Sequence, residues 1–407
     1  MISISEDFNN ALKAQVIRAR AKVVFNYATP LTLYRDKIIS IDAISSGEIA
    51  LGCVQDDKVT CRFSYDAFTI AQYNQRVDVE LYFGCVVNDV EEYVLIGTYK
   101  TNRWQADDQE KFIEVELVSK ISTDQVEDLL PATNVSLKDY ITSACGVLMN
   151  ETVTIGDSCL DATLSQCYLY AKTIKEQLKL FGVAINGVFR YVQGLECAPY
   201  KFTTDSKEIK LGANESLLYY KKENDYLDSK AIVQIMISAF TKSDNASLYS
   251  ATVNIPKGVD SYNVKLDFGT PSIINYIQFK KYSYFYTVDA SLWSAMLRLG
   301  VLTASVASRV DLTCYGVKIQ SNVLGSTSDN SKTYISNPYI QNSSQAGSLD
   351  ASIYTSDKYV LSLKGDPTIQ IGDTIGVEGL GNIMVTKHSI KFDGSLLSTV
   401  EGVLKVE

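Results

Sequence analysis

The C-terminal stretch, residues 359–407, reads YVLSLKGDPTIQIGDTIGVEGLGNIMVTKHSIKFDGSLLSTVEGVLKVE. Turn residues divide it into short apolar runs, at Gly365-Asp366-Pro367, Gly372-Asp373 and Asp393-Gly394. Asp393-Gly394 fits a two-residue hairpin turn, because glycine tolerates the positive φ that such a turn requires. After it, alternate residues from 396 to 406 are mostly apolar, which predicts a strand with one buried face. The stretch is therefore predicted to form a closing β-meander.

A second series of strands is predicted near the N-terminus, after a polar and partly helical lead. The runs cover residues 21–27, 36–43, 49–54, 58–65, 76–88, 93–104 and 111–122. Ser45-Ser46-Gly47 is predicted to form one of the turns between them. Short strands at this spacing, separated by turn signals, are typical of a β-barrel or a β-sandwich.

Between these two ends, the sequence predicts a small α+β unit. Ser136-x-x-Asp139 and Thr173-x-x-Glu176 are capping-box patterns, the first with Asp in place of the usual Glu. Apolar residues at helical spacing follow each box, and Gly146 and Gly182 are placed to end the two helices. Asn186-Gly187 lies between two short apolar runs and predicts a tight hairpin.

The middle of the chain, residues 206–320, is predicted to be rich in strands. Residues 276–286 are dense in aromatic side chains, and residues 290–299 are predicted to form a short helix. Asn337-Pro338 marks a turn, and residues 344–354 are predicted to form a second short helix before the closing meander.

The order of these motifs resembles that of the tail and baseplate hub proteins of tailed bacteriophages, a family shared with contractile injection systems. The first barrel pattern of that family corresponds here to residues 39–43 (ISIDA), Leu51-Gly52 and residues 95–99 (LIGTY). The unit around Thr173-x-x-Glu176 is similar to its second domain. The C-terminal motif matches Gly365, Pro367, Ile369, Gly372-Asp373, Ile375, Val377, Val385, Ile390, Phe392, Asp393-Gly394, Leu396 and Ser398.

The resemblance implies a mainly β, multidomain fold with two β-barrel domains and a small α+β insert. The expected boundaries place an N-terminal β-barrel hub domain at residues 1–122 and an α+β domain at residues 123–205. A β-rich middle domain would cover residues 206–320. A C-terminal β-barrel hub domain would cover residues 321–407.

The resemblance also implies a structural function in the virion, at the tail tip or baseplate, for a protein made in the host cytoplasm. Three copies would form a ring that joins the six-fold tail tube, or a distal tail protein, to a three-fold spike or fibre. The tape-measure protein and DNA would pass through it, DNA only in transit. Because the chain ends at Glu407, directly after the meander, the spike, fibre or receptor-binding protein is expected to be a separate polypeptide.

Composition agrees with such a role. The formal net charge of −9 argues against a nucleic-acid-binding surface or an anionic membrane surface, both of which need clustered Lys and Arg. No apolar run reaches the ~18 residues of a membrane-spanning segment, and no secretory signal is visible. Eight cysteines stand at positions 53, 61, 85, 145, 159, 167, 197 and 314. They are predicted to be free buried thiols rather than disulfides.

No catalytic, cofactor-binding or metal-binding residue is predicted. The single histidine, His388, lies in a predicted strand, and no serine stands in a G-x-S-x-G elbow. Cys53 and Cys61 lack the spacing of zinc ligands. Gly376-x-x-Gly379-x-Gly381 is interpreted as turn glycines, because no helix start with Lys-Ser or Lys-Thr follows.

Two other functions stay open on the sequence. A β-rich glycoside hydrolase would need paired carboxylates. Such pairs occur at Glu91-Glu92, Asp107-Asp108 and Glu114 with Glu116, where turns and a solvated strand face are the simpler interpretation. A carbohydrate-binding adhesin module is favoured by the tyrosines of residues 276–286, although alternating aromatics in a strand also build cores and subunit interfaces.

Overall fold

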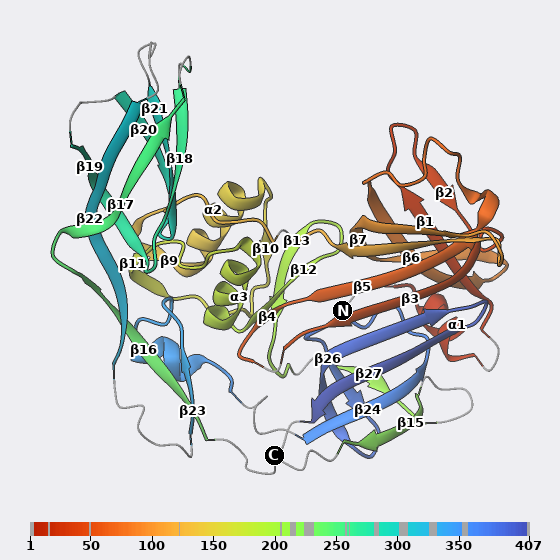
Figure 1. Ribbon diagram of the computed structural model, residues 1–407. Helices are drawn as coiled ribbons and strands as arrows, with labels where there is room; N and C mark the ends of the chain where they lie inside the picture. The colour runs from red at the N-terminus through yellow and green to blue at the C-terminus, as the bar shows by residue number, and fades with distance from the viewer. Residues whose placement is uncertain are drawn as a thin grey trace.

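The computed structural model describes residues 4–404 except for 15–16, 49, 122, 204–205, 212–216, 224–231, 257–258, 260, 281–284, 301–307, 325–331 and 352–356. The fold is mainly β and contains several sheets, which confirms the predicted fold class (Figure 1). The helices of the described residues are α1 (Glu6–Lys13), α2 (Leu137–Met149), α3 (Ile174–Ile185) and α4 (Ser343–Ser348).

One large sheet combines strands from both ends of the chain. Its order is β15-β24-β27-β26-β3-β5-β8-β7-β6-β1-β2, with β25 beside β26 and β14 beside β25. Its N-terminal strands are β1 (Ala19–Phe25), β2 (Leu31–Leu33), β3 (Ile38–Ser46), β5 (Asp56–Ser64), β6 (Asp78–Val87), β7 (Val90–Asp107) and β8 (Phe112–Ser119). Its other strands are β14 (Lys207–Ile209), β15 (Leu217–Lys222), β24 (Asp357–Lys364), β25 (Thr374–Val377), β26 (Gly381–Phe392) and β27 (Leu396–Leu404).

The antiparallel pairing of β3 with β26, here called the seam, joins the two ends of the chain into this sheet. It runs from Ile41 opposite Phe392 to Ser46 opposite Lys387. The predicted turn at Ser45-Ser46-Gly47 is therefore wrong for the two serines, because ladders on both sides hold them in β3. Two closed barrels are not confirmed, because the strand order of the described residues is open, with β15 and β2 as its ends.

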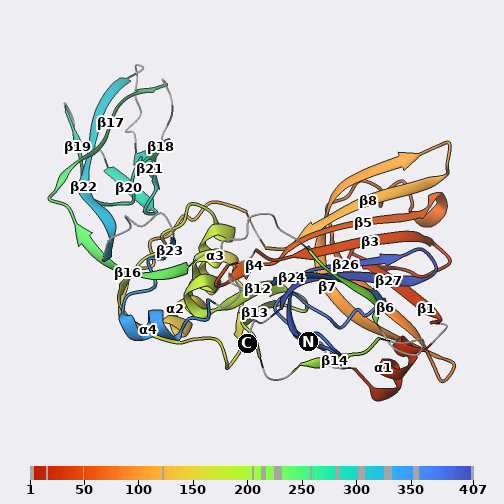
Figure 2. The ribbon, with the colours of Figure 1, turned by 90° about the horizontal axis from the view of Figure 1, so that it is seen from below.

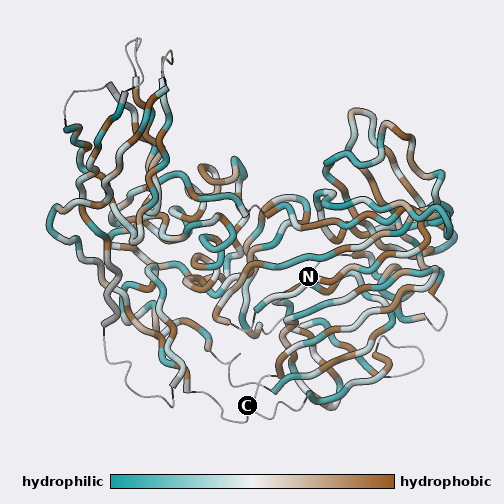
Figure 3. Tube along the Cα trace, in the orientation of Figure 1, coloured by the Kyte–Doolittle hydropathy of each residue, from teal (hydrophilic) through white to brown (hydrophobic). Residues whose placement is uncertain are grey.

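Separate hydrophobic cores lie beneath the N-terminal and C-terminal halves of this sheet. The first is built around Phe25, Phe63 and Phe83, and the second around Ile371 and Met384. Figure 3 shows hydrophobic and hydrophilic positions interspersed along the strands, the pattern of a sheet with one buried face. The core of α1 is a small satellite cluster on β6 and β7.

The closing hairpin forms where it was predicted, with one difference in the loop. Phe392 pairs with Leu396, so the loop has three residues rather than two, and Gly394 takes the positive φ of +97°. Alternate residues of β27 from Leu396 to Val400 are buried, as predicted. The alternation ends at Gly402 and Val403, which are both buried.

The α+β unit contains two helices and two small sheets, with strands β4 (Cys53–Val54), β9 (Ala132–Ser136), β10 (Thr154–Ile155), β11 (Thr163–Cys167), β12 (Gly187–Tyr191) and β13 (Leu195–Pro199). Both predicted helix starts are confirmed. Ser136 caps α2 by accepting from the Asp139 amide, and Thr173 and Glu176 form a full capping box on α3.

Both predicted helix ends are wrong, and so is the Asn186-Gly187 hairpin. Each helix continues to an asparagine in the left-handed conformation, Asn150 after α2 and Asn186 after α3. Asn186 uses the positive φ that a hairpin turn would also need. Gly182 stays inside α3 because the helix packs against backbone there: a Cβ at Gly182 would lie 2.7 Å from the Gly187 carbonyl oxygen.

The middle of the chain forms a β-sandwich that projects away from the large sheet (Figures 1 and 2). Its strands and stalk are β16 (Ile232–Lys242), β17 (Ala246–Ile255), β18 (Ser261–Asp267), β19 (Ser272–Phe279), β20 (Phe285–Ala290), β21 (Ser294–Gly300), β22 (Ser308–Leu324) and β23 (Lys332–Ser336). The helix predicted at residues 290–299 is wrong, because Ala295, Leu297 and Leu299 alternate into the sandwich core as strand β21. The helix predicted at residues 344–354 is confirmed only as the shorter α4, and residues 352–354 lie outside the described part.

Candidate functional site

The β15 end of the large sheet exposes a strand edge. β15 pairs with β24 on one side, and in the described part of the chain no strand pairs with Tyr219–Lys222 on the other. Leu218, Tyr219 and Tyr220 are all exposed, Tyr219 to 59%. An exposed edge with large apolar side chains is a template for pairing with another chain.

The opposite end of the sheet is different in length and chemistry. β2 has three residues, pairs with β1 alone among the described strands, and is followed by the half-exposed Tyr34. The sheet therefore presents two unlike edges. Pairing of one edge with the other edge of the next copy is a head-to-tail contact, whereas pairing of an edge with the same edge of a second copy is self-complementary.

The solvent-facing side of the seam carries charges of both signs. One row across the sheet contains Lys364, Leu397, Lys391 and Asp42, each opposite the next. Leu397 is half-exposed between the two lysines. Beyond Asp42 the row continues through Thr60 to Glu116, so this face is mixed in charge.

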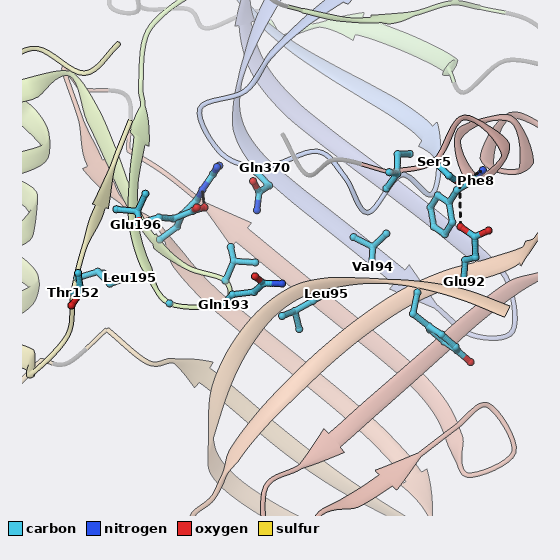
Figure 4. A pocket seen from close by; sticks show the side chains of 16 residues that line it. Ser5, Phe8, Glu92, Val94, Leu95, Thr152, Gln193, Leu195, Glu196 and Gln370 are labelled. Atoms are coloured by element: carbon cyan, nitrogen blue, oxygen red, sulfur yellow. Dashed lines mark hydrogen bonds and ion pairs between the residues drawn. The ribbon is translucent and has the colours of Figure 1, made fainter. Parts of the chain in front are cut away.

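A cleft of about 680 Å³ lies where the α+β unit meets the large sheet. Figure 4 shows its walls, with Ser5 and Phe8 near α1 at one end and Glu196 and Leu195 of β13 at the other. Arg190 is buried there, pairs with Glu196, and donates to the Ile371 carbonyl at 3.2 Å. These contacts tie β12 and β13 to the C-terminal part of the sheet.

The carboxylates of this cleft do not face each other as a glycosidase pair. Figure 4 places Glu92 and Glu196 at opposite ends. Glu92 accepts from the Ser5 hydroxyl at 3.2 Å, and its neighbour Glu91 accepts from Tyr93 and pairs with Arg20.

The other carboxylate pairs lie in a turn and on a strand face, as predicted. Asp107 accepts from the backbone amide of Gln109 at 2.9 Å, and Asp108 accepts from a tyrosine hydroxyl, that of Tyr65. Glu114 pairs with an arginine of the neighbouring strand β5 at 2.8 Å, and Glu116 faces one of β7 at 3.8 Å.

His388 lies in β26, inside the seam. It is 4% exposed, and its Nδ1 lies 3.0 Å from the Ile369 carbonyl oxygen. Burial lowers the pKa of His388 to about 4. No partner within the described residues reaches Nε2, which lies beside a small cavity lined by Ser45 and Gln55. The histidine lies in a strand, as predicted, and its side chain is buried in the sheet.

A buried aspartate of β5, the strand beside the seam, was missed by sequence reasoning. Asp57 is 6% exposed and accepts from the Ser45 hydroxyl at 2.6 Å and the Gln55 amide at 2.8 Å. Burial raises its pKa to about 6. The signal was available, because Asp57 has the same parity as the buried Val59 and Cys61 in β5.

The cysteines are buried as predicted, whereas the interpretation as turn glycines is wrong for Gly376. All eight cysteines are buried free thiols, and Cys53 and Cys61 belong to different cores. The described residues contain no cluster of three or more metal-ligating side chains. Gly379 and Gly381 have positive φ in the turn between β25 and β26, and Gly376 lies in β25.

The described tyrosines of residues 276–286 lie on the sandwich. Tyr276 is 46% exposed and stacks on Tyr315, with ring centroids 4.9 Å apart. Tyr286 is also partly exposed, beside Phe279. Residues 281–284 lie outside the described part of the chain.

Comparison with known structures finds tail proteins with a similar fold. The fold is similar to that of the tail protein from Neisseria meningitidis MC58, with a TM-score of 0.51 and 6% identity over 95% of this chain and 96% of that chain. A 43 kDa tail protein of prophage MuSo2 from Shewanella oneidensis is similar with a TM-score of 0.48, 8% identity and coverage of 95% and 98%. No protein-family model matches the chain, and no curated protein matches it.

The Neisseria match shows that this chain has the fold of a tail protein along almost its whole length. The tail-protein fold that the sequence motifs implied is thereby confirmed. No helix of the described residues is long and apolar enough to span a membrane.

Proposed function

We propose that this protein is a structural hub of a phage-type tail, located in the virion at the tail tip or baseplate, and that it is not an enzyme. The observation that carries the proposal is the tail-protein fold over 95% of the chain. A match of this extent includes the large sheet, the α+β unit and the sandwich together. The sequence motifs for the hub family point to the same function in the same order along the chain.

Three copies are proposed to form the ring through the unlike edges of the large sheet. The exposed Tyr219 edge of β15 in one copy would meet the β2 end of the next copy. A head-to-tail contact of this kind closes into a ring when a whole number of copies completes a full turn. Backbone hydrogen bonds at the β15 edge would then continue the sheet between copies.

The ring would join a six-fold tail tube, or a distal tail protein, to a separate three-fold spike or fibre. Each copy contributes one group of β strands from each end of its chain. Three copies would therefore present six such groups, which supports a quasi-six-fold face. The tape-measure protein and DNA would pass through the hole. With a net charge of −9 per copy, an acidic wall would not displace counterions from DNA phosphates and would let DNA slide.

Negative-stain electron microscopy of the purified protein tests this proposal. The expected class averages show a ring with three-fold symmetry and a central hole. Compact single lobes in every class, without rings at any protein concentration, would contradict it.

The sandwich sheet that contains β17, β19 and β22 favours carbohydrate binding as a second candidate function. Beside the stacked Tyr276 and Tyr315, the Ser250 hydroxyl donates to Thr313 at 3.2 Å. Exposed rings and hydroxyl groups together are suited to sugars, which have apolar faces and many hydroxyls. A glycan array with wild type and Tyr276→Ala tests it: a signal that the variant loses would support it, and no signal would remove it.

A further inference from the structure

Two of the eight cysteines differ from the rest in their geometry. Cys159 lies at the end of the turn that follows β10, and Cys197 lies in β13 beside β10. The Cys159 sulfur is 3.7 Å from the Cys197 carbonyl oxygen, and both side chains are buried in the core of the α+β unit. The Cys197 side chain is also close enough to Cys159 to influence its pKa.

The backbone holds this arrangement from both sides. Ile155 of β10 pairs with Cys197, and the next amide, of Gly156, donates to the Cys197 carbonyl at 2.9 Å. The turn then closes when the Cys159 amide donates to the Gly156 carbonyl at 3.0 Å. Cys159 is therefore folded back over Cys197 by three consecutive contacts.

The surrounding charges make the two thiols chemically unequal. The Lys138 ammonium donates to the carbonyls of Gly156 and Asp157 at 3.3 and 3.2 Å, which places a positive charge at the turn. The hydrogen bond from Cys197 is the largest cause that lowers the pKa of Cys159, and Lys138 contributes to it. Burial raises the pKa of Cys197. An activated thiol beside a second thiol is the usual arrangement of a redox-sensitive pair.

We propose that Cys159 and Cys197 form a disulfide when the protein meets an oxidising medium that contains low-molecular-weight disulfides. The Cys159 thiolate attacks one sulfur of such a disulfide, and the other half leaves as a thiolate that takes up a proton. Cys197 then loses its proton and attacks the Cys159 sulfur of the mixed disulfide, which releases the second half as a thiol. One small disulfide is reduced to two thiols while two cysteines are oxidised.

The bond would link the turn after β10 to β13 and would join two residues that are 38 positions apart. A small disulfide would reach Cys159 by movement of the turn alone, because Asp157 and Ser158, which precede Cys159, are exposed. The staple would fix β13, whose Leu195 and Glu196 line the cleft between the α+β unit and the large sheet. The proposal is independent of the ring, since all its residues lie in one copy.

Thiol counting on the full-length protein tests the proposal. The protein is incubated with oxidised glutathione, denatured, alkylated and analysed by mass spectrometry and peptide mapping. The expected result is two alkylated cysteines fewer than the eight of the reduced protein, with peptides around 159 and 197 cross-linked. Alkylation of all eight after prolonged oxidation, or a cross-link between other cysteines, would overturn the proposal.

Three variants sharpen the test. Cys159→Ser should prevent the cross-link, whereas Cys145→Ser, from the same buried core, should leave it intact. Lys138→Gln should slow cross-linking several-fold without preventing it, because the thiolate of Cys159 becomes less favourable. Cross-linking at an unchanged rate in Lys138→Gln would contradict the proposed activation of Cys159.

Discussion

At the scale of single residues, two buried charges decide how the seam and the C-terminal loop depend on pH. The Asp57 carboxylate is buried beside the seam, and its partners are two neutral donors, Ser45 and Gln55. Asp366 instead has a cation, Lys207, beside it. The first charge weakens the folded state when it ionises, and the second strengthens it.

Asp57→Asn is expected to stabilise the protein above pH 6. The pKa of Asp57 is raised from 3.8 to about 6 by burial, so the wild type loses stability as pH rises through this interval. The variant lacks that loss and should gain about 1–2 kcal/mol in free energy of unfolding at pH 7.5, with little gain below pH 4.

Urea unfolding at the two pH values checks this prediction. Asp56→Asn is the matched control, because Asp56 is exposed and pairs with Lys175 at the surface, where ion pairs contribute little. An equal effect of Asp57→Asn at both pH values would show that ionisation of Asp57 is not the cause.

Lys207→Met is expected to cost about 3–5 kcal/mol, because it leaves the Asp366 carboxylate buried without its cation. The two side chains are 13% and 2% exposed, and Lys207 also donates to the Thr368 hydroxyl at 3.0 Å. Burial acts to raise the pKa of Asp366, but Lys207 and hydrogen bonds lower it overall. In the wild type, this stability is therefore lost as pH falls below about 4.

The double variant Lys207→Met with Asp366→Asn separates the buried charge from lost packing. It should recover most of the stability in urea unfolding at pH 7. A single variant that loses less than about 1 kcal/mol would mean that water reaches Asp366.

At the scale of elements, the sequence predicted strands better than their partners. The alternation in residues 359–407 and 21–122 places most strands, because one face of each is buried. The pairing of β3 with β26 joins residues more than three hundred positions apart, and no local pattern encodes such a contact.

Local ambiguity explains the errors in single elements. Positive φ at Asn186 serves a helix cap as well as a hairpin turn, so Asn186-Gly187 could not distinguish them. Leu297 and Leu299 fit both a short helix and a strand, and contacts in the sandwich core decide. The buried Asp57 has the parity of the buried residues of β5, but the predicted strand began only at residue 58.

Gly52→Ala is expected to destabilise the protein by about 2–4 kcal/mol, because overpacking against backbone cannot relax easily. A Cβ at Gly52 would lie 2.1 Å from the Gly182 carbonyl oxygen and 2.6 Å from that of Gly187, where β4, α3 and β12 meet. Thermal unfolding measures the loss.

Gly146→Ala is the control for this substitution. Gly146 lies inside α2 with no atom within 4 Å of an added Cβ. Alanine should stabilise this helix by about 0.5–1 kcal/mol. Equal effects of the two substitutions on stability would contradict the close contact with α3 as the cause of the loss in Gly52→Ala.

The β15 edge is expected to control association. Leu218→Glu with Tyr219→Glu places charges on the exposed edge, and charged edges resist pairing with another chain. The variant should remain folded but monomeric at concentrations at which wild type associates, as size-exclusion chromatography can show. Tyr276→Glu on the sandwich is the control and should associate as wild type does; association of the edge variant would exclude β15 as the contact.

At the scale of the whole molecule, the chain has the fold of a tail protein, and the sandwich projects from it (Figure 2). The open sheet with unlike edges is the feature that relates this fold to the proposed ring. Self-complementary pairing would give dimers, whereas head-to-tail pairing gives rings of any number that the geometry allows. The number of copies is therefore the central quantity.

The most direct measurement is the solution mass by light scattering over a wide range of protein concentration. The hub proposal predicts a species of three times the 45.0 kDa chain mass that becomes dominant as concentration rises. A mass of 45.0 kDa at every concentration, or a stable dimer, would contradict it.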